Sequence, residues 1–348
     1  MPSALAPRIK RRRQFYVQTD PQAIGPAPNV LVVRPSSLGD IVHALPLVHD
    51  LRAQHPGIAV DWIAEESFTG LVRLNRGVRR VIPIALRRWR HELFARATWR
   101  EFARFRREVS ATRYDAVLDL QEQVKGALMA ALARGPVHGP DRKSVREPIV
   151  TLLYRHRHRV DPDQHLIDRC RRVAGEAFGY EPRGAPHFDL APPLEGDPPD
   201  APYAVFLHST SRADKLWPEA HWRALAQHVV TAGFVVVLPW GSPGERARSE
   251  RIARAHDKAI VPARRDLPEL ASLLARAVWV VGVDTGLTHL AAALGTPTIA
   301  LFTATDPRLA GVARASAVAR DLGGVGVVPS PDEAIAALAP LLRTVPSC

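Results

Sequence analysis

The sequence predicts an α/β protein in which two Rossmann-like parallel-sheet domains face a central cleft. Two observations lead to this fold class. Strand and helix patterns alternate along most of the 348 residues, and a Pro-, Gly- and Asp-rich stretch at 181–202 interrupts the alternation once. Such alternation is typical of parallel sheets with right-handed crossovers. The 46% hydrophobic content is sufficient for two medium-sized cores.

The interruption sets the expected domain boundaries. We predict a basic, disordered tail over residues 1–28, where Pro, Arg and Gln dominate without periodicity. An N-terminal domain then covers 29–180 and a linker 181–202. A C-terminal domain follows over 203–330, and a last helix with a short tail occupies 331–348.

In the N-terminal domain, short apolar runs predict strands and helical spacing predicts the segments between them. The first apolar run, VLVV, precedes a Gly-containing turn and then a helical pattern. The expected strands cover 30–33, 59–66, 79–86 and 114–121, and the expected helices cover 41–54, 101–110 and 124–132.

In the C-terminal domain the same alternation restarts after the linker. The expected strands cover 203–208, 233–241, 259–263, 278–284 and 296–303. The expected helices cover 218–233, 245–255, 267–277 and 287–294. A final helix over 331–343 could pack on either domain.

The charge of the chain is strongly basic, with a net charge of +12 and a pI near 10.5. Between Arg73 and Arg113 there are 13 arginines and 3 glutamates. Nucleic acid, an anionic membrane surface or an acidic small substrate could each account for this excess, and solvated helix faces account for part of it.

Composition also excludes several classes of protein. Two cysteines, Cys170 and Cys348, exclude a disulfide scaffold and fit a reducing cytoplasm. The first 20 residues lack the apolar core of a secretory signal, and no apolar run is long enough to span a membrane. We therefore expect a cytoplasmic protein.

The first candidate binding loop follows the strand that begins at Tyr203. It carries Ser209, Thr210 and Ser211, and then Lys215. Hydroxyls, backbone amides and an ammonium group can together hold a diphosphate without a metal ion. An ordinary polar loop between strand and helix is the alternative.

The second candidate loop is Asp284-Thr285-Gly286, between a strand and a helix start. Its amides would point out of the carboxyl edge of the sheet, with the positive end of the helix behind them. Helix capping is the commonest use of an acid such as Asp284. We interpret His289, inside that helix, as a packed or capping histidine.

Two further acidic features could either bind a ligand or only stabilise a local turn or helix start. Glu245 follows a Gly/Pro turn after a strand and is placed to accept hydrogen bonds from ribose hydroxyls, although a first-turn helix acid fits equally well. Asp161-Pro162-Asp163 resembles a metal-binding DxD, but it lies outside any strand end and we interpret it as a turn and cap. GxGxxG and GxxxxGK[ST] are absent, so dinucleotide redox chemistry is unsupported.

The first strand–turn–helix segment, Val30 to Pro46, is the usual cradle for a phosphate, but its turn ends in the carboxylate of Asp40. An anion would be repelled there. Asp40 could cap the amides of Val42 or His43, or it could act as a base.

Several motifs in order resemble the lipopolysaccharide heptosyltransferases of glycosyltransferase family nine. From about residue 30 to 310 they read RPSSLGDIVHALP, DWIAEE, RRVIPIALRRWR, DLQEQVKGAL, HSTSRADKLWPEAHWRAL, LPWGSPGE and GVDTGLTHLAAALGTPTIALFTATDP. The segment IALRRWR with the later REP (146–148) favours the branch that adds the first heptose to the Kdo of Kdo–lipid A. The sequence departs from the family in two places. The resemblance does not extend past Pro307. In addition, Arg264-Arg265 stands where the family has a hydrophobic residue near the adenine.

The resemblance implies a GT-B fold, ADP-heptose (ADP-L-glycero-β-D-manno-heptose) as donor, and inversion at the anomeric carbon without a metal or other cofactor. It assigns Asp40 as the catalytic base and Lys215 to the phosphate-binding loop. Because negative charge grows on the diphosphate as it leaves, a cation at Lys215 should also act in catalysis. The other donor-binding residues that the resemblance implies are Thr210, Ser211, Glu245, Asp284, Thr285 and Gly286.

On the acceptor side, the resemblance implies that Arg87, Arg88 and Arg90 bind Kdo–lipid A. It also implies a peripheral location on the cytoplasmic face of the inner membrane, and no nucleic-acid partner. Two alternatives remain: another family-nine transferase with a different sugar nucleotide or acceptor, or a non-enzymatic basic protein that binds membrane or nucleic acid. The two hydroxyl- and Gly-containing loops favour a transferase, because a basic surface does not need them.

Overall fold

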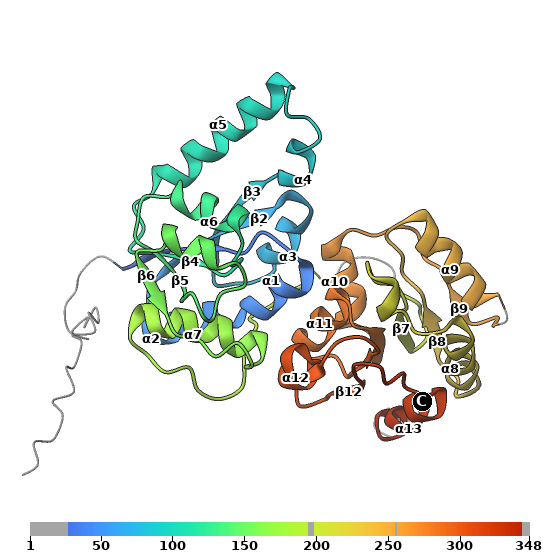
Figure 1. Ribbon diagram of the computed structural model, residues 1–348. Coiled ribbons are helices and arrows are strands. Elements are labelled where there is room, and N and C mark those ends of the chain that lie inside the picture. Colours follow the sequence, from blue (N-terminus) through green and yellow to red (C-terminus); the bar gives the residue numbers. More distant parts are fainter. Residues whose placement is uncertain (1–26, 194–197, 255, 343–348) are drawn as a thin grey trace, which may run out of the picture.

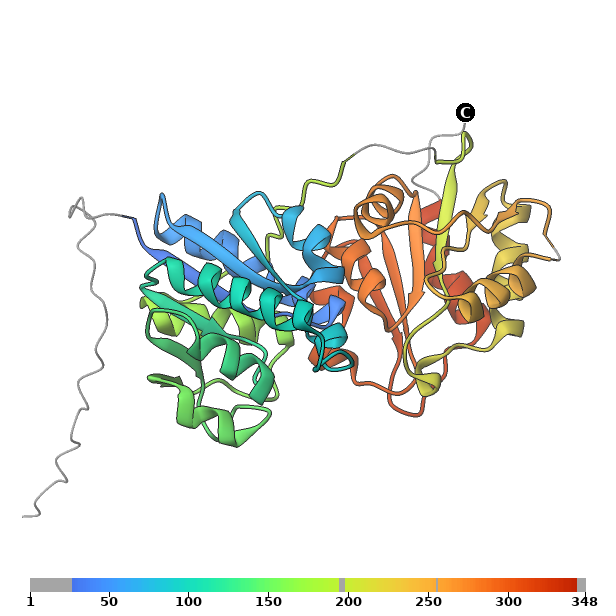
Figure 2. The same cartoon turned by 90° about the horizontal axis from the view of Figure 1, so that it is seen from above.

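The computed structural model describes residues 27–193, 198–254 and 256–342 and consists of two α/β domains that lie side by side. Each domain is built on a six-stranded sheet with parallel pairing, and helices cover both faces of each sheet (Figures 1 and 2). The predicted α/β class with two Rossmann-like domains is confirmed. Most of the predicted tail, residues 1–28, lies outside the described residues.

The N-terminal sheet has the strand order β3-β2-β1-β4-β5-β6. The central strand β1 is almost completely buried because helices cover both faces, which explains its uninterrupted apolar sequence. The strand bounds are β1 Asn29–Val33, β2 Ala59–Glu65, β3 Val78–Ile84, β4 Ala116–Asp119, β5 Val137–Pro140 and β6 His156–His158.

The helices of this domain are α1 Leu38–Ala44, α2 Pro46–Gln54, α3 Thr69–Arg73, α4 Leu86–Trp89, α5 Arg96–Ala111, α6 Val124–Ala131 and α7 Leu166–Phe178. The single helix predicted over 41–54 is wrong. The chain forms α1 and α2 with Leu45 between them, because Pro46 has no N–H to donate to the carbonyl of Val42.

The C-terminal sheet has the strand order β12-β11-β10-β7-β8-β9. Its central strand β10 is buried throughout, as β1 is in the other domain. The strand bounds are β7 Tyr203–Leu207, β8 Val235–Val237, β9 Ala259–Ile260, β10 Trp279–Val283, β11 Thr298–Phe302 and β12 Ala319–Gly323.

The helices of this domain are α8 Glu219–Thr231, α9 Pro243–Ala253, α10 Leu267–Ala275, α11 Gly286–Ala293, α12 Pro307–Ala310 and α13 Pro331–Leu342. The last helix packs on this domain rather than on the other one. Ala334 and Leu338 belong to the same hydrophobic cluster as Trp217, and the Trp217 indole donates to the carbonyl of Pro329 at 2.7 Å.

The two domains contact each other through an apolar interface around α1 and α11. Ile41 and Val42 of α1 belong to one continuous hydrophobic cluster with Leu290 and Ala291 of α11. A two-pronged ion pair between Arg314 and Asp168 supports this contact, with N–O distances of 2.9 and 2.6 Å. The facing strand ends are therefore held close together.

The first half of the predicted linker is fixed to the N-terminal domain. The side chain of Asn75 donates to the carbonyl of Phe188 at 2.7 Å, and the backbone N–H of Arg76 donates to the carbonyl of Asp189 at 3.0 Å. Leu190 forms an isolated β-bridge with Asn75. The predicted linker therefore belongs to the N-terminal domain at least as far as Leu190.

Candidate active site

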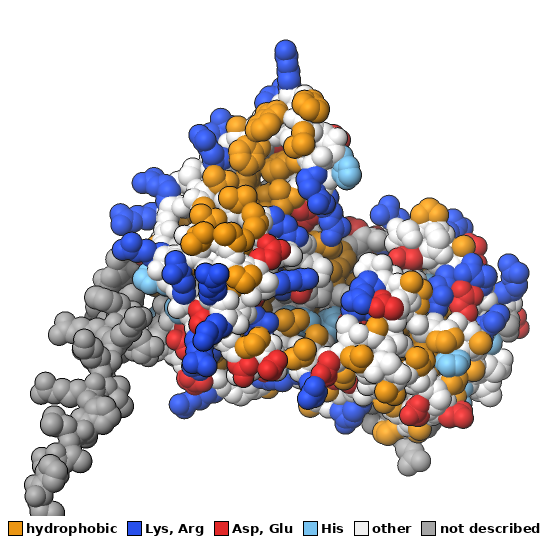
Figure 3. Space-filling view, in the orientation of Figure 1, with side chains coloured by type: hydrophobic (Ala, Val, Ile, Leu, Met, Phe, Trp, Pro, Cys, Tyr) orange, Lys and Arg blue, Asp and Glu red, His pale blue; other side chains and the backbone are white. Residues whose placement is uncertain are grey.

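A groove separates the two domains in the space-filling view, and Lys and Arg side chains lie along its walls (Figure 3). Two neighbouring cavities open there, of about 520 and 470 Å³. They share Thr210, Ser211 and Thr285, so that the two predicted loops of the C-terminal domain form the boundary between them. Asp40 of the N-terminal domain lines the first cavity.

Asp40 is the third residue of α1, where its carboxylate folds back on the helix start. Its Oδ2 accepts from the backbone N–H and the hydroxyl of Ser37, at 2.9 and 2.8 Å. Its Oδ1 lies 2.8 Å from Nη2 of Arg34. The predicted cap to the amides of Val42 or His43 is therefore wrong, since Asp40 binds the preceding N–H of Ser37 in a capping box.

These contacts keep Asp40 ionised. Burial alone would raise the pKa of Asp40, but the Arg34 guanidinium and the two Ser37 hydrogen bonds outweigh it and lower this pKa to about 2. The carboxylate is thus charged at neutral pH and lies at the cavity wall, although it is a weak base in this state.

Asp284 lies across the groove, at the carboxyl end of β10, and contacts three partners. Lys215 Nζ is 2.6 Å from its Oδ2, Thr305 Oγ1 is 2.5 Å from the same oxygen, and His289 Nε2 is 3.1 Å from its Oδ1. Burial tends to raise the pKa of Asp284, but these three partners lower it overall, with His289 the largest contributor among them. Thr285, not Asp284, is the N-cap residue of α11.

The start of α11 is built for close approach. Thr285 makes no side-chain capping bond, and Gly286 follows as the first helical residue. A Cβ on Gly286 would lie 2.8 Å from the backbone N of Gly39 and 2.4 Å from Cδ2 of Leu38. Glycine is therefore required here for the two helix starts to meet, and the α11 amides remain available to an anion in the cavity.

A pair of histidines connects the two helix starts. His43 Nε2 of α1 lies 3.3 Å from His289 Nδ1 of α11, and His289 in turn contacts Asp284. Burial, followed by the charges of His289 and His165, holds the pKa of His43 well below its usual value. A hydrogen donated by His43 to His289, and another donated by His289 to Asp284, would satisfy both contacts. The prediction that His289 is a packed or capping histidine therefore lacked its polar contacts with His43 and Asp284.

The acceptor-side arginines differ in their surroundings. Arg87 lines the first cavity, its backbone N–H donates to Glu65 at 3.0 Å, and its guanidinium lies 5.4 Å from the ring centroid of Phe68. Arg88 instead shares its guanidinium between Glu66 and Glu101 and does not line this cavity.

Lys125 belongs to the same basic region, although sequence reasoning assigned no role to this residue of the motif DLQEQVKGAL. Its Nζ donates to the hydroxyl of Ser36 at 3.4 Å. Its pKa is lowered by burial and then by the charges of Arg90 and Arg87. Three cationic side chains therefore gather on the N-terminal side of the groove.

The second cavity contains Glu245 and an aromatic side chain. Oε2 of Glu245 accepts from the backbone N–H groups of Gly241 and Ser242, at 2.6 and 3.3 Å, so the first-turn role considered as an alternative is present. Glu245 also lines the cavity, together with Trp240 and Leu267. The apolar surface expected near 264–265 is thus supplied by neighbouring residues.

Comparison with known proteins supports this arrangement. The family model for glycosyltransferase family 9 (heptosyltransferase) matches residues 102–324. Lipopolysaccharide heptosyltransferase 1 of Salmonella typhimurium is 44% identical over 290 residues, covering 81% of this chain and 90% of the relative. The corresponding Pseudomonas aeruginosa protein is 42% identical over 286 residues, covering 81% and 80%.

The chain belongs to glycosyltransferase family 9. It is an enzyme, a glycosyltransferase. The solved structure of E. coli heptosyltransferase WaaC with ADP superposes with a TM-score of 0.83 at 36% identity, covering 90% of this chain and 99% of that one. The WaaC structure with ADP-2-deoxy-2-fluoro heptose gives a TM-score of 0.79 at 36% identity, covering 88% and 98%. The GT-B fold implied by the resemblance is confirmed.

The structure of this family 9 enzyme brings together most of the residues that the sequence selected. The first cavity holds Asp40, Arg87, Thr210, Ser211, Lys215, Asp284, Thr285 and Gly286, and the second adds Glu245. Arg88 and Arg90 line neither cavity. Sequence reasoning gave no role to Arg34, His43, Lys125, Trp240 and Thr305. All five lie within the motifs that carry the resemblance, and those motifs were the signal that could have found them.

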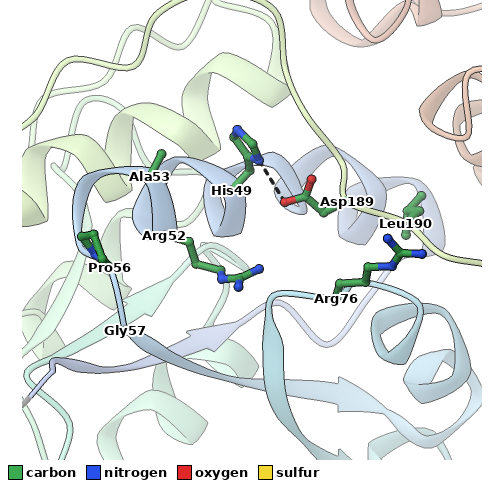
Figure 4. A pocket seen from close by; sticks show the side chains of 8 residues that line it. All are labelled: His49, Arg52, Ala53, Pro56, Gly57, Arg76, Asp189 and Leu190. Carbon is green, nitrogen blue, oxygen red and sulfur yellow. Dashed lines mark hydrogen bonds and ion pairs between the residues drawn. The ribbon is translucent and has the colours of Figure 1, made fainter.

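Another cavity, of about 550 Å³, lies in a different part of the family 9 enzyme (Figure 4). It opens beside the end of α2 and the residues that precede β2, at the amino edge of the sheet. His49 Nδ1 lies 2.9 Å from Asp189 Oδ2 there, so that a linker residue is tied to α2. None of the predicted site residues lines this cavity.

The Asp161-Pro162-Asp163 segment is a local turn, as the sequence predicts. The backbone N–H of Asp163 donates to the side chain of Asp161 at 2.9 Å.

Proposed function

We propose that this enzyme is an inverting heptosyltransferase that needs no metal. It would transfer L-glycero-D-manno-heptose from ADP-heptose to the Kdo of Kdo–lipid A, in the synthesis of the lipopolysaccharide inner core. The likeness to heptosyltransferase 1 and to WaaC bound to ADP supports this proposal. The observation that carries it is the pair of neighbouring cavities. The start of α11 lies at their boundary, and Lys215 and Asp40 both line the first cavity.

In this proposal the donor occupies both cavities. The adenine and ribose lie in the second cavity, between Trp240 and Glu245, and the diphosphate lies at Thr210, Ser211 and the α11 amides. The boundary shared by the cavities has hydroxyls and helix-start amides, and the first cavity adds the cation Lys215, which together are the groups that a diphosphate requires. Lys215 then stabilises the negative charge that grows on the diphosphate as it leaves.

Asp40 acts as the base in the first cavity. The acceptor hydroxyl oxygen attacks the anomeric carbon while the bond from that carbon to the diphosphate oxygen breaks, and the hydroxyl proton passes to the Asp40 carboxylate. The hydroxyl becomes acidic only as its oxygen bonds to the oxocarbenium-like carbon, so a weak but fully ionised base is sufficient.

The acceptor approaches from the N-terminal side, where Arg87, Arg90 and Lys125 gather. Guanidinium groups bind carboxylates and phosphates with two parallel hydrogen bonds, and Kdo–lipid A carries both kinds of anion. We place the enzyme at the cytoplasmic face of the inner membrane as a peripheral protein, without a nucleic-acid partner. No helix in the described residues combines the length and apolarity needed to cross a bilayer.

A reconstituted assay with purified ADP-heptose and Kdo–lipid A tests the proposal. The enzyme should transfer one heptose to this acceptor in the presence of excess EDTA. It should leave an acceptor that already carries the first heptose unchanged. Transfer only to the acceptor that already carries one heptose, or only from another sugar nucleotide, would contradict the proposed donor and acceptor. The family assignment would remain intact in either case.

A further inference from the structure

The N-terminal domain exposes large apolar side chains on the face that carries α5 and α6. One group lies at the connection between α4 and α5 and on the first turn of α5: Leu93, Phe94 and Trp99. A second group lies on α6 and on the 3₁₀ turn Pro148–Leu153: Val124, Leu128, Ile149, Leu152 and Leu153. We call both groups together the apolar face. Phe94 is fully exposed and Leu152 is 72% exposed, which is unusual for a surface exposed only to water.

The two groups belong to one side of the domain. Phe105 of α5, Ala127 of α6 and Val150 of the 3₁₀ turn pack into one cluster beneath this surface. The backbone N–H of Val124 donates to Glu147 at 2.8 Å and so joins α6 to that turn. Figure 3 shows hydrophobic side chains extending over α5 and toward α6 on a single face.

Exposed cationic side chains flank the residues of the apolar face along the chain. The exposed Lys and Arg residues nearby are Arg96, Arg100, Arg106, Arg107, Lys125, Arg142, Lys143, Arg146 and Arg155. Two neighbouring acids are engaged in ion pairs, Glu101 with Arg88 and Glu108 with Arg104. An apolar centre with a cationic rim matches the boundary between the acyl chains and the anionic headgroups of a bilayer.

The apolar face also adjoins the acceptor side of the groove. Lys125 reaches Ser36 from α6, and Ser36 directly precedes the Ser37 that binds Asp40. Val124 and Leu128, on the same helix as Lys125, are exposed. A lipid whose acyl chains remain in the bilayer below this face could present its sugar to the first cavity without leaving the membrane.

We propose that the apolar face inserts into the headgroup region of an anionic lipid bilayer and holds the groove over a membrane-bound acceptor. This inference rests on the proposed function, and it adds a contact that charge alone does not provide. Electrostatic attraction by arginines is screened by salt, whereas burial of apolar side chains is not. The Trp99 indole N–H donates to the carbonyl of Leu93, so Trp99 is held in place within the apolar face, and tryptophan is enriched at membrane–water interfaces.

Vesicle sedimentation of the full chain tests the insertion. With vesicles of phosphatidylcholine and phosphatidylglycerol, part of the binding should persist at 1 M NaCl. The double variant Phe94→Ser/Leu152→Ser should lose at least tenfold in partition at that salt concentration, or about 1.4 kcal/mol. The matched control Val325→Ser/Val328→Ser, which changes exposed apolar residues of the other domain, should bind as the unchanged protein does. Equal binding by the Phe94/Leu152 variant, or complete release by salt, would overturn the proposal.

Tryptophan fluorescence gives a second readout. All seven tryptophans lie in the described residues, and Trp99, 60% exposed, is the most exposed of them. Lipids brominated near the headgroup should quench this emission, and Trp99→Phe should remove most of the quenching. Absence of quenching would contradict insertion into the bilayer. A protein partner would then be the remaining explanation for the exposed apolar side chains.

Turnover separates the two proposals. With an acceptor from which the acyl chains have been removed, the Phe94/Leu152 variant should retain the turnover of the unchanged protein. If neither protein transfers heptose to any form of the acceptor, the proposed function fails, whatever the vesicles show. If both transfer heptose but bind vesicles equally, only the membrane inference fails.

Discussion

The two helix starts that meet in the groove, those of α1 and α11, have similar backbones and different electrostatics. Each follows the carboxyl end of a central buried strand, and Gly39 and Gly286 allow them to touch. At α1, the Asp40 carboxylate binds Ser37 and faces Arg34. At α11, the carboxylate of Asp284 lies before the helix and contacts Lys215 instead.

This difference is the reason why we propose that the α11 start, and not the α1 start, receives an anion. The α1 start already contains a negative charge, so a phosphate placed there would meet Asp40. The α11 start has no acid in its first turn and has a cation beside it. In the proposed function, these two cradles of the same kind divide proton transfer and diphosphate binding between them.

Asp40→Asn should produce the largest effect. Asparagine can still accept the Ser37 N–H but cannot take up a proton, so the variant should lose roughly a hundredfold or more in turnover. It should fold with a lower melting temperature, because the buried Arg34 guanidinium loses its carboxylate partner. Steady-state kinetics with ADP-heptose, together with a thermal melt, measure both outcomes. Near-normal turnover would leave Asp40 as a capping residue and require another base.

Gly286→Ala should separate the two helix starts. The added Cβ would clash with Leu38 and the backbone of Gly39, so turnover should fall by roughly tenfold or more, while the fold of each domain is kept. Gly244→Ala is the matched control, because a Cβ there meets nothing within 4 Å. Equal turnover in the two variants would show that catalysis does not need the contact between α1 and α11.

Arg87→Ala tests the acceptor side. Since Arg87 lines the cavity that also contains Asp40, its loss should raise the KM for the acceptor by about tenfold and leave the KM for ADP-heptose nearly unchanged. Arg88→Ala, which removes an arginine paired with Glu66 and Glu101 outside the cavity, should change either KM less. The opposite ranking would mean that the acceptor reaches the groove along the Arg88 side.

Some of this site could be predicted from sequence and some could not. Thr210, Lys215 and Asp284 follow apolar strands, and strand ends of a parallel sheet converge on one edge, so their proximity was predictable. His43 with His289, and Lys125 with Ser36, depend on three-dimensional placement that no local pattern encodes.

The fold shows the same division. The buried runs at β1 and β10 predicted the centres of both sheets. The outer strands β5 and β6 were missed, because VHGP and HRH have neither β-branched runs nor alternation and are held by their neighbours.

The smallest expected effect concerns pH, through His43 between the two helix starts. Its folded-state pKa is depressed by burial and by His289 and His165, so between the usual histidine pKa and that depressed value the unfolded chain binds more protons. The free energy of unfolding should therefore fall as pH drops below about 6.5, by at most about 1.4 kcal/mol per pH unit. Urea unfolding at pH 7, 6 and 5 should show a flatter dependence for His43→Asn. An unchanged slope would show that His43 does not contribute.

Calorimetric titration of ADP into the Lys215→Ala and Asp40→Asn variants tests the division between the two helix starts most directly. Removal of Lys215 leaves the Asp284 carboxylate without its cation beside the diphosphate, so ADP should bind about tenfold more weakly. Asp40→Asn should bind ADP within about twofold of the unchanged enzyme, because no phosphate lies at α1 in the proposed complex. A strong change in ADP affinity with Asp40→Asn, and none with Lys215→Ala, would contradict the assignment of the diphosphate to α11.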